Sequence, residues 1–198
     1  NFMDGLDGMA AGTAVVAAAF FALICHMNGQ PLPGLMASAL SIASCGFLLF
    51  NWPPAKIFMG DIGSTFLGFL FAALPLLLLQ SNPAPATVPW LLLTMPLLLL
   101  HYLFDTLFTF TRRLLAGENV TQAHRSHLYQ LLQRGGWSHL RVSLLYAGLA
   151  AMQGVTALCI LKTAAPTLAL LLALLAFLLL YTLLAFVILR RARSLSLI

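Results

Sequence analysis

The sequence predicts an all-α, polytopic membrane helix bundle with about six transmembrane helices, forming a single membrane-embedded domain over 1–198. Hydrophobic residues make up 61% of the 198 positions and charged residues only 8%, whereas soluble chains carry about 25% charged residues. The leucine-rich runs lack the period of two that a β-barrel strand requires. A helix needs about 20 apolar residues to cross a bilayer. Six segments come close to that length: 9–27, 33–50, 62–80, 88–110, 142–161 and 166–189.

The connections between these segments are of two kinds. The segments 28–34 ("NGQPLPG") and 81–89 ("SNPAPATVP") are uncharged and rich in proline and glycine, as turns between helices are. The connection 111–141 is long and polar, and it contains a predicted interfacial helix. We expect Thr121 to cap the start of that helix and the glycine pair at 135–136 to end it.

The basic residues indicate how the chain is oriented. Short loops rich in lysine and arginine stay on the cytoplasmic side of a membrane. If the six segments alternate in direction, only Lys162 falls on the outer side, and the other nine basic residues form a cytoplasmic rim. Such a rim would attract anionic lipid headgroups and phosphates. The rim predicts that the polar connections face the cytoplasm, and it does not imply nucleic-acid binding.

Asp61 lies in "GDIGS", where a cytoplasmic loop becomes the third segment. Glycine lets the backbone approach a ligand, and a helix N-terminus offers N–H groups to an anion. A carboxylate would repel a bare phosphate unless a cation lies between them. Mg²⁺, with Mn²⁺ as an alternative, suits carboxylates combined with phosphate oxygens. Asp61 is therefore the predicted metal ligand, although aspartate also commonly caps helices.

Asp4 and Asp7 precede the first segment in "DGLDG". Residues three apart share a face of a helix, so both carboxylates can point at one ligand. The alternative is a tight turn whose aspartates cap the first segment. Two acidic, glycine-flanked helix entrances on one membrane face favour a metal–diphosphate site.

His124, Arg125 and His127 add hydrogen-bond donors to the same membrane face. Imidazole and guanidinium groups suit phosphate oxygens. His127 is therefore a candidate catalytic residue, and His124 and Arg125 are candidate substrate-binding residues. The alternative is that they are ordinary polar residues at a hydrated interface.

Asp105 lies at the inner end of the fourth segment, with His101 four residues before it and Arg112 two turns after it. This spacing favours a structural pair, and a proton relay is the alternative.

The two acidic stretches resemble the motifs of a known family, the polyprenyl-phosphate N-acetylhexosamine-1-phosphate transferases. "NFMDGLDGMA" is similar to its N-x-x-D-G-x-D-G-[LM]-A signature, and Asn1 matches the leading asparagine. "NWPPAKIFMGDIGS" is similar to its N-x-x-P-A-x-[IV]-F-M-G-D-x-G-S loop. The resemblance implies that an undecaprenyl-phosphate oxygen attacks the sugar-linked phosphate of a UDP-N-acetylamino sugar, with Mg²⁺ assisting and UMP released. It also implies a protein of the bacterial inner membrane.

The resemblance also implies a role for each matched residue. Asp61 matches the metal-binding aspartate, and Asp4 and Asp7 match the paired active-site carboxylates. Asn51 and Phe58 match positions that hold the nucleobase, Phe58 by stacking.

The histidine loop departs from the family pattern D-R-x-H-x-H-H. In "HRSHLYQ", His124 replaces the leading aspartate, Tyr129 and Gln130 replace the last two histidines, and Arg125 and His127 remain. This variant resembles the branch that acts on modified N-acetylamino sugars in O-antigen or capsule assembly. It speaks against the phospho-MurNAc-pentapeptide enzyme, which stays the alternative within the family.

The family's D-D motif and several membrane spans would precede Asn1. We therefore expect this sequence to be the C-terminal portion of an enzyme that is inactive without the rest. An ion-coupled transporter and a non-catalytic membrane scaffold are the alternatives from other classes. A homodimer is an open alternative to a monomer.

Overall fold

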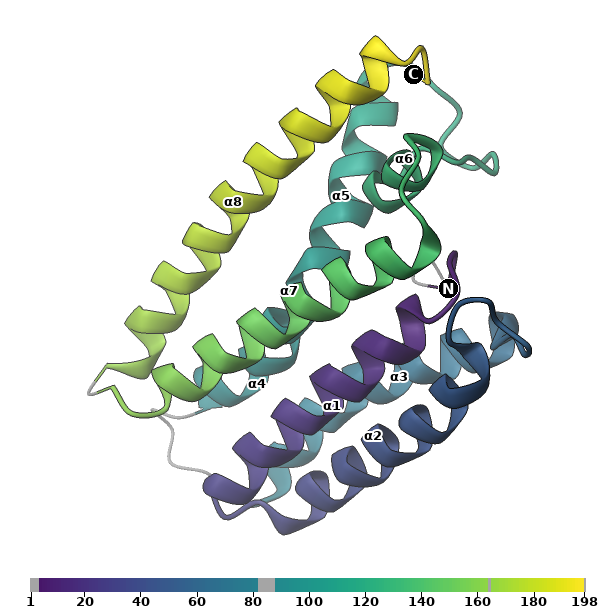
Figure 1. Ribbon diagram of the computed structural model, residues 1–198. Helices are drawn as coiled ribbons and strands as arrows, with labels where there is room; N and C mark the ends of the chain where they lie inside the picture. Colours follow the sequence, from purple (N-terminus) through teal and green to yellow (C-terminus); the bar gives the residue numbers. More distant parts are fainter. Residues whose placement is uncertain (1–3, 82–87, 164, 198) are drawn as a thin grey trace.

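The computed structural model describes residues 4–81, 88–163 and 165–197, and every regular element within these ranges is helical (Figure 1). The predicted all-α class is confirmed. The elements are α1 (Met9–Met27), α2 (Pro31–Asn51), α3 (Gly60–Leu77), η1 (Leu78–Ser81), α4 (Val88–Leu98), α5 (Leu100–Leu115), α6 (Leu128–Arg134), α7 (His139–Ile160) and α8 (Pro166–Ser194).

Five of the described helices, α1, α2, α3, α7 and α8, are long and apolar enough to cross a membrane. The fourth predicted segment is not one straight helix, because α4 and α5 meet at an angle of 70°. Pro96 lies one turn before the break, and proline removes a backbone hydrogen bond and clashes with the preceding turn. The expected six spans are found when this bent pair counts as one.

Helix α1 lies at the centre of the packing, between α2 and α7 (Figure 1). Its buried surface is rich in alanine, which allows neighbouring helices to approach closely. On α7, Gly154 receives the ring of Phe20, and a Cβ added to Gly154 would overlap that ring. The α1–α7 contact therefore depends on the missing side chain at position 154.

Helices α2, α3 and α8 present large apolar side chains outward. Ile42 is 72% exposed, Ile62 89% and Leu183 61%. Exposing such surfaces to water is unfavourable. Lipid tails are as apolar as the side chains themselves, so contact with them carries no such cost. These exposed faces are what a membrane-embedded bundle requires.

The start of α1, the end of α2 and the start of α3 lie together at one end of the bundle (Figure 1). We call this the motif end. Helix α6 and the start of α7 lie beside it, and Tyr102, near the start of α5, donates a hydrogen bond to the Met9 carbonyl. Lys162 lies in the connection between α7 and α8, at the opposite end. The predicted grouping of acidic motifs with the histidine loop is therefore present.

The short helix α6 begins later than expected. It starts at Leu128 and not after Thr121, although Gly135 follows its last residue as predicted. The Thr121 hydroxyl donates to Asn119 Oδ1 at 2.7 Å, and Arg113 donates to the Asn119 carbonyl at 2.7 Å. The cap predicted at Thr121 was wrong, because these contacts hold the preceding segment in a non-helical conformation.

Two glycines of α7 make a matched test of this packing. Gly154→Ala is expected to lower the free energy of unfolding by about 1–3 kcal/mol, because the new methyl group overpacks against Phe20. Gly148→Ala meets no atom within 4 Å and should stabilise the helix by about 0.5–1 kcal/mol. Denaturant titration in detergent measures both, and equal effects of the two variants would contradict the close α1–α7 contact.

Candidate active site

The acidic turn at residues 4–8 precedes α1 and is not helical. Gly8 has φ 74°, in the left-handed region, and it caps α1 without a side-chain hydrogen bond. Asp4 and Asp7 therefore do not share a helical face, and the expectation drawn from their spacing was wrong. The turn nevertheless brings both carboxylates to one cavity.

That cavity has a volume of about 290 Å³ and lies at the motif end. We call it the carboxylate cavity. It gathers predicted site residues from two separate stretches of the sequence, 4–7 and 51–61. The cavity is lined by Asp4, Gly5, Leu6, Asp7, Asn51, Phe58, Gly60 and Asp61.

The Asp7 side chain joins three elements. Its Oδ2 accepts a hydrogen bond from the Ala55 backbone N–H at 3.1 Å and lies 3.3 Å from His139 Nδ1. The Ser143 hydroxyl donates to the Asp7 carbonyl at 2.7 Å. Asp7 does not cap α1. It ties the acidic turn to the α2–α3 loop and to the first turns of α7.

Asn51 is 3% exposed, and its amide is already engaged. Its Oδ1 accepts from the Gly8 backbone N–H at 2.9 Å, and its Nδ2 donates to the Ile57 carbonyl at 2.9 Å. Phe58 differs, because it is 76% exposed and lines the same cavity. Nucleobase binding by both residues stays a prediction, and the free ring of Phe58 suits stacking better than the occupied amide of Asn51.

Asp61 lies in the first turn of α3 and is exposed. Met59 occupies the cap position without a side-chain hydrogen bond, so the alternative that Asp61 caps this helix is wrong. A carboxylate at this position is favoured by the positive end of the helix dipole. Its side chain remains available to a ligand in the carboxylate cavity.

The charge of Asp61 acts on Asp4 across the cavity. Burial raises the pKa of Asp4 above its ordinary value, the charge of Asp61 raises it further, and the backbone N–H of Gly60 opposes both. Within the described ranges, no three His, Cys, Asp or Glu side chains lie close enough together to hold a metal. Mg²⁺ needs only one or two carboxylates when phosphate oxygens and waters complete its shell. Asp61 and Asp4 fit that ligand set.

The histidine loop lines a second cavity of about 430 Å³. His124 and His127 both line it, and their ring centroids are 4.8 Å apart. Burial and the charge of Arg113 lower the pKa of His124. Arg125 is exposed and belongs to neither cavity lining, and Asn1 lies outside the described residues.

Asp105 proves to be the anchor of the histidine loop. It is 2% exposed, and sequence spacing pointed to His101 and Arg112 as its partners. His101 Nδ1 instead contacts Gln153 Oε1 at 2.8 Å. The Asp105 carboxylate accepts hydrogen bonds from Thr109 Oγ1 (3.1 Å), Leu128 N (2.9 Å), Tyr129 N (3.3 Å) and Tyr146 Oη (3.0 Å) and lies 3.3 Å from His127 Nδ1.

Tyr129 connects the two cavities. A Cβ added to Gly5 would overlap the Tyr129 hydroxyl, so only glycine permits this approach. The Tyr129 ring stacks on His127 with centroids 5.8 Å apart. Burial, and then the charge of Asp105, raises the pKa of Tyr129 to about 12, so its hydroxyl stays protonated near neutral pH. Neither this contact nor the Asp7–His139 pair has a signal in the sequence.

These features define a class: a multi-pass membrane protein with an acidic site where several spans end. Residues 1–79 match the model described as Glycosyl transferase family 4. A Bacillus subtilis protein named probable undecaprenyl-phosphate N-acetylglucosaminyl 1-phosphate transferase is 36% identical over 147 residues, covering 73% of this chain and 39% of the relative.

Phospho-N-acetylmuramoyl-pentapeptide-transferase of Listeria monocytogenes is 32% identical over 164 residues, covering 81% of this chain and 47% of the relative. The protein of that name from Staphylococcus epidermidis is 41% identical over 80 residues, covering 40% of this chain and 25% of the relative. The chain thus spans less than half the length of these relatives. These matches support the family that its motifs predicted, glycosyl transferase family 4.

Asp105→Asn tests the anchoring of the loop. The amide offers one acceptor oxygen in place of two and no charge, and hydrogen bonds to charged groups contribute about 1.5–3 kcal/mol each. Hydrogen exchange at the backbone amides of Leu128 and Tyr129 should become at least about tenfold faster. Thr109→Val removes a single donor and is the control. Unchanged protection in Asp105→Asn would show that the loop is held by other contacts.

Asn51→Asp tests the double hydrogen bond at the end of α2. The carboxylate can still accept from Gly8, but it cannot donate to the Ile57 carbonyl. The variant should lose about 1–3 kcal/mol of stability, because a buried polar group is left unsatisfied. Thermal unfolding without any nucleotide measures this loss. A variant as stable as the parent chain would show that the Asn51–Ile57 hydrogen bond contributes little to stability.

Proposed function

We propose that the complete protein transfers the 1-phosphate of a UDP-linked N-acetylamino sugar to undecaprenyl phosphate and releases UMP. The proposal rests on one observation: Asp4, Asp7, Asp61 and the exposed ring of Phe58 line a single cavity at one end of the bundle. The family matches support it, since the named relatives act on undecaprenyl-phosphate or phospho-N-acetylmuramoyl substrates. The orientation of the basic residues favours the cytoplasmic face of the bacterial inner membrane.

The residues of the carboxylate cavity take separate roles in this proposal. Asp61 and Asp4 would hold Mg²⁺, which supplies charge neutralisation to the diphosphate when bound. Phe58 would stack on the uracil ring. Asp7, paired with His139 and Ala55, keeps the acidic turn in place while Asp4 faces the substrate.

In this reaction the protein itself forms no covalent bond to the substrate. An oxygen of the lipid phosphate attacks the sugar-linked phosphorus, and the bond from that phosphorus to the UMP oxygen breaks. Such transfers are accelerated mainly by positioning and by stabilising charge. The exposed apolar faces of α2 and α3 begin beside the cavity, so the polyprenyl tail can lie in the bilayer while its phosphate reaches the site.

In this proposal the histidine loop selects the amino sugar. Its departures from the family pattern favour a modified N-acetylamino sugar and the initiation of O-antigen or capsule, whereas the relatives include a pentapeptide transferase of comparable similarity. His127 and His124 line the cavity next to the carboxylates. That cavity is where we expect the sugar to be selected.

An ion-coupled transporter fits the described geometry less well. Transporter sites form near the bilayer midplane on broken helices. The broken pair α4–α5 bends at Leu99, whereas the three cavity carboxylates lie at the ends of α1 and α3.

Asp61→Asn in the complete protein should lower Mg²⁺-dependent UMP release at least about 100-fold, because the diphosphate loses its charge-neutralising partner. Glu118→Gln is the control, since Glu118 is exposed and pairs with Arg113 outside both cavities. Turnover by Asp61→Asn at the parent rate would refute the metal role.

Substrate choice is measured with the same complete protein and undecaprenyl phosphate. UDP-GlcNAc, UDP-linked deoxy amino sugars and UDP-MurNAc-pentapeptide are compared by kcat/KM. We expect one of the first two to be preferred. A preference for the pentapeptide substrate would move the protein to the alternative branch, and no UMP from any donor would overturn the proposed reaction.

A further inference from the structure

A third cavity lies away from the carboxylate cavity, between α5, α6, α7 and α8. It has a volume of about 220 Å³. Its walls are mostly apolar and include Phe104 of α5, Leu149 of α7 and Leu184 of α8. We call it the α8 cavity. It lies along parts of α7 and α8 that belong to candidate membrane spans, so in a membrane it would lie beside lipid tails.

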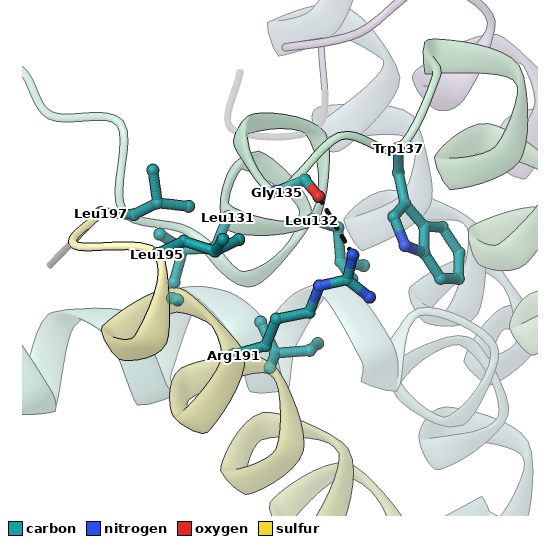
Figure 2. A pocket seen from close by; sticks show the side chains of 9 residues that line it. Leu131, Leu132, Gly135, Trp137, Arg191, Leu195 and Leu197 are labelled. Carbon is teal, nitrogen blue, oxygen red and sulfur yellow. Dashed lines mark hydrogen bonds between the residues drawn. The ribbon is translucent and has the colours of Figure 1, made fainter.

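The α8 cavity continues toward the charged end of α8. Leu132, Trp137 and Ile188 line both this cavity and the small pocket drawn in Figure 2. Figure 2 shows Arg191 reaching from α8 toward the Gly135 carbonyl, with Trp137 close to its guanidinium group. The one hydrogen bond drawn there is long, 3.4 Å from Nη2. Arg191 is exposed and keeps donors for another acceptor.

The rim at this point is strongly basic. Arg190, Arg191 and Arg193 follow one another on the last turns of α8. In residues 4–81, 88–163 and 165–197, the ion pairs involve only Arg113, His127 and His139 as the basic partners. The three arginines of α8 therefore carry positive charge that no described carboxylate neutralises. An anion suits this position, and tryptophan is a residue typical of headgroup depth.

We propose that the α8 cavity binds one anionic glycerophospholipid, with an acyl chain in the cavity and the phosphate on Arg191. Basic pockets between membrane helices hold anionic headgroups in this way. A free phosphate would leave the apolar cavity unfilled, and a second copy of this chain would oppose arginine with arginine. This inference is independent of the proposed reaction.

The polyprenyl phosphate of the proposed reaction is a different ligand. Its phosphate must reach the carboxylate cavity, whereas the end of α8 lies beyond α6 from the acidic turn (Figure 1). The α8 cavity does, however, share a wall with the histidine loop. Leu128 and Tyr146 line it, and both donate hydrogen bonds to Asp105. A bound lipid would thus pack directly behind the anchor of that loop.

Native mass spectrometry of the complete, delipidated protein tests the proposal. Dioleoyl phosphatidylglycerol is compared with dioleoyl phosphatidylethanolamine, which has the same chains and no net charge. We expect phosphatidylglycerol to be retained about fivefold more tightly, as one arginine contact at a membrane surface would give. Arg191→Gln should remove that preference. Arg193→Gln makes the same charge change outside the cavity lining and should keep it.

Leu184→Trp fills the cavity and should lower retention of both lipids. Equal retention of the two lipids by the parent protein, or equal losses in Arg191→Gln and Arg193→Gln, would overturn the proposal. Displacement of phosphatidylglycerol by one equivalent of undecaprenyl phosphate would assign the cavity to the acceptor lipid instead. Failure of the complete protein to retain either lipid would show that another part of the chain covers it.

Discussion

A carboxylate buried in apolar surroundings is stable only when hydrogen-bond donors surround it. Asp105 meets this requirement by drawing donors from its own helix, from the start of α6 and from α7. Those donors are also the groups that determine where the histidine loop lies. Because the donors at the start of α6 converge on this carboxylate, the position of His127 follows from the burial of Asp105. The second cavity, Tyr129 and its contact with Gly5 depend on that anchor in turn.

The two acidic motifs divide into residues that hold the site and residues that face it. The Asp7 carboxylate contacts His139 and the Ala55 backbone N–H of the α2–α3 loop. The Asn51 amide forms hydrogen bonds with the backbone of Gly8 and of Ile57. Asp4, Asp61 and Phe58 keep atoms toward the cavity. Within each motif, some residues thus hold the backbone in place and others face the cavity. The first group provides the rigid frame that a positioning-based reaction requires.

The bilayer explains the distribution of the remaining side chains. Apolar residues face outward from α2, α3 and α8. Inside the bundle, Gln153 forms hydrogen bonds with both His101 and Tyr181. Charge gathers at the motif end and along the last turns of α8. One surface of the molecule therefore combines a proposed reaction site with a basic rim for anionic lipids.

The sequence by itself determined the helical class, the apolar spans, the gathering of the acidic motifs at one end of the bundle and the resemblance to the family. These follow from local composition and contiguous motifs, since a span needs only its own apolar length. It misplaced the start of α6, made α4 and α5 one helix, and put Asp4 and Asp7 on a helical face. Only the tertiary structure decided that Asp7 pairs with His139, that Tyr129 lies on Gly5, and that Asp105 holds the histidine loop. The Asp7–His139 and Tyr129–Gly5 contacts join residues more than a hundred positions apart. The contacts of Asp105 with Leu128 and Tyr146 cross from α5 to α6 and α7. All of these depend on how the helices pack and not on spacing within one segment.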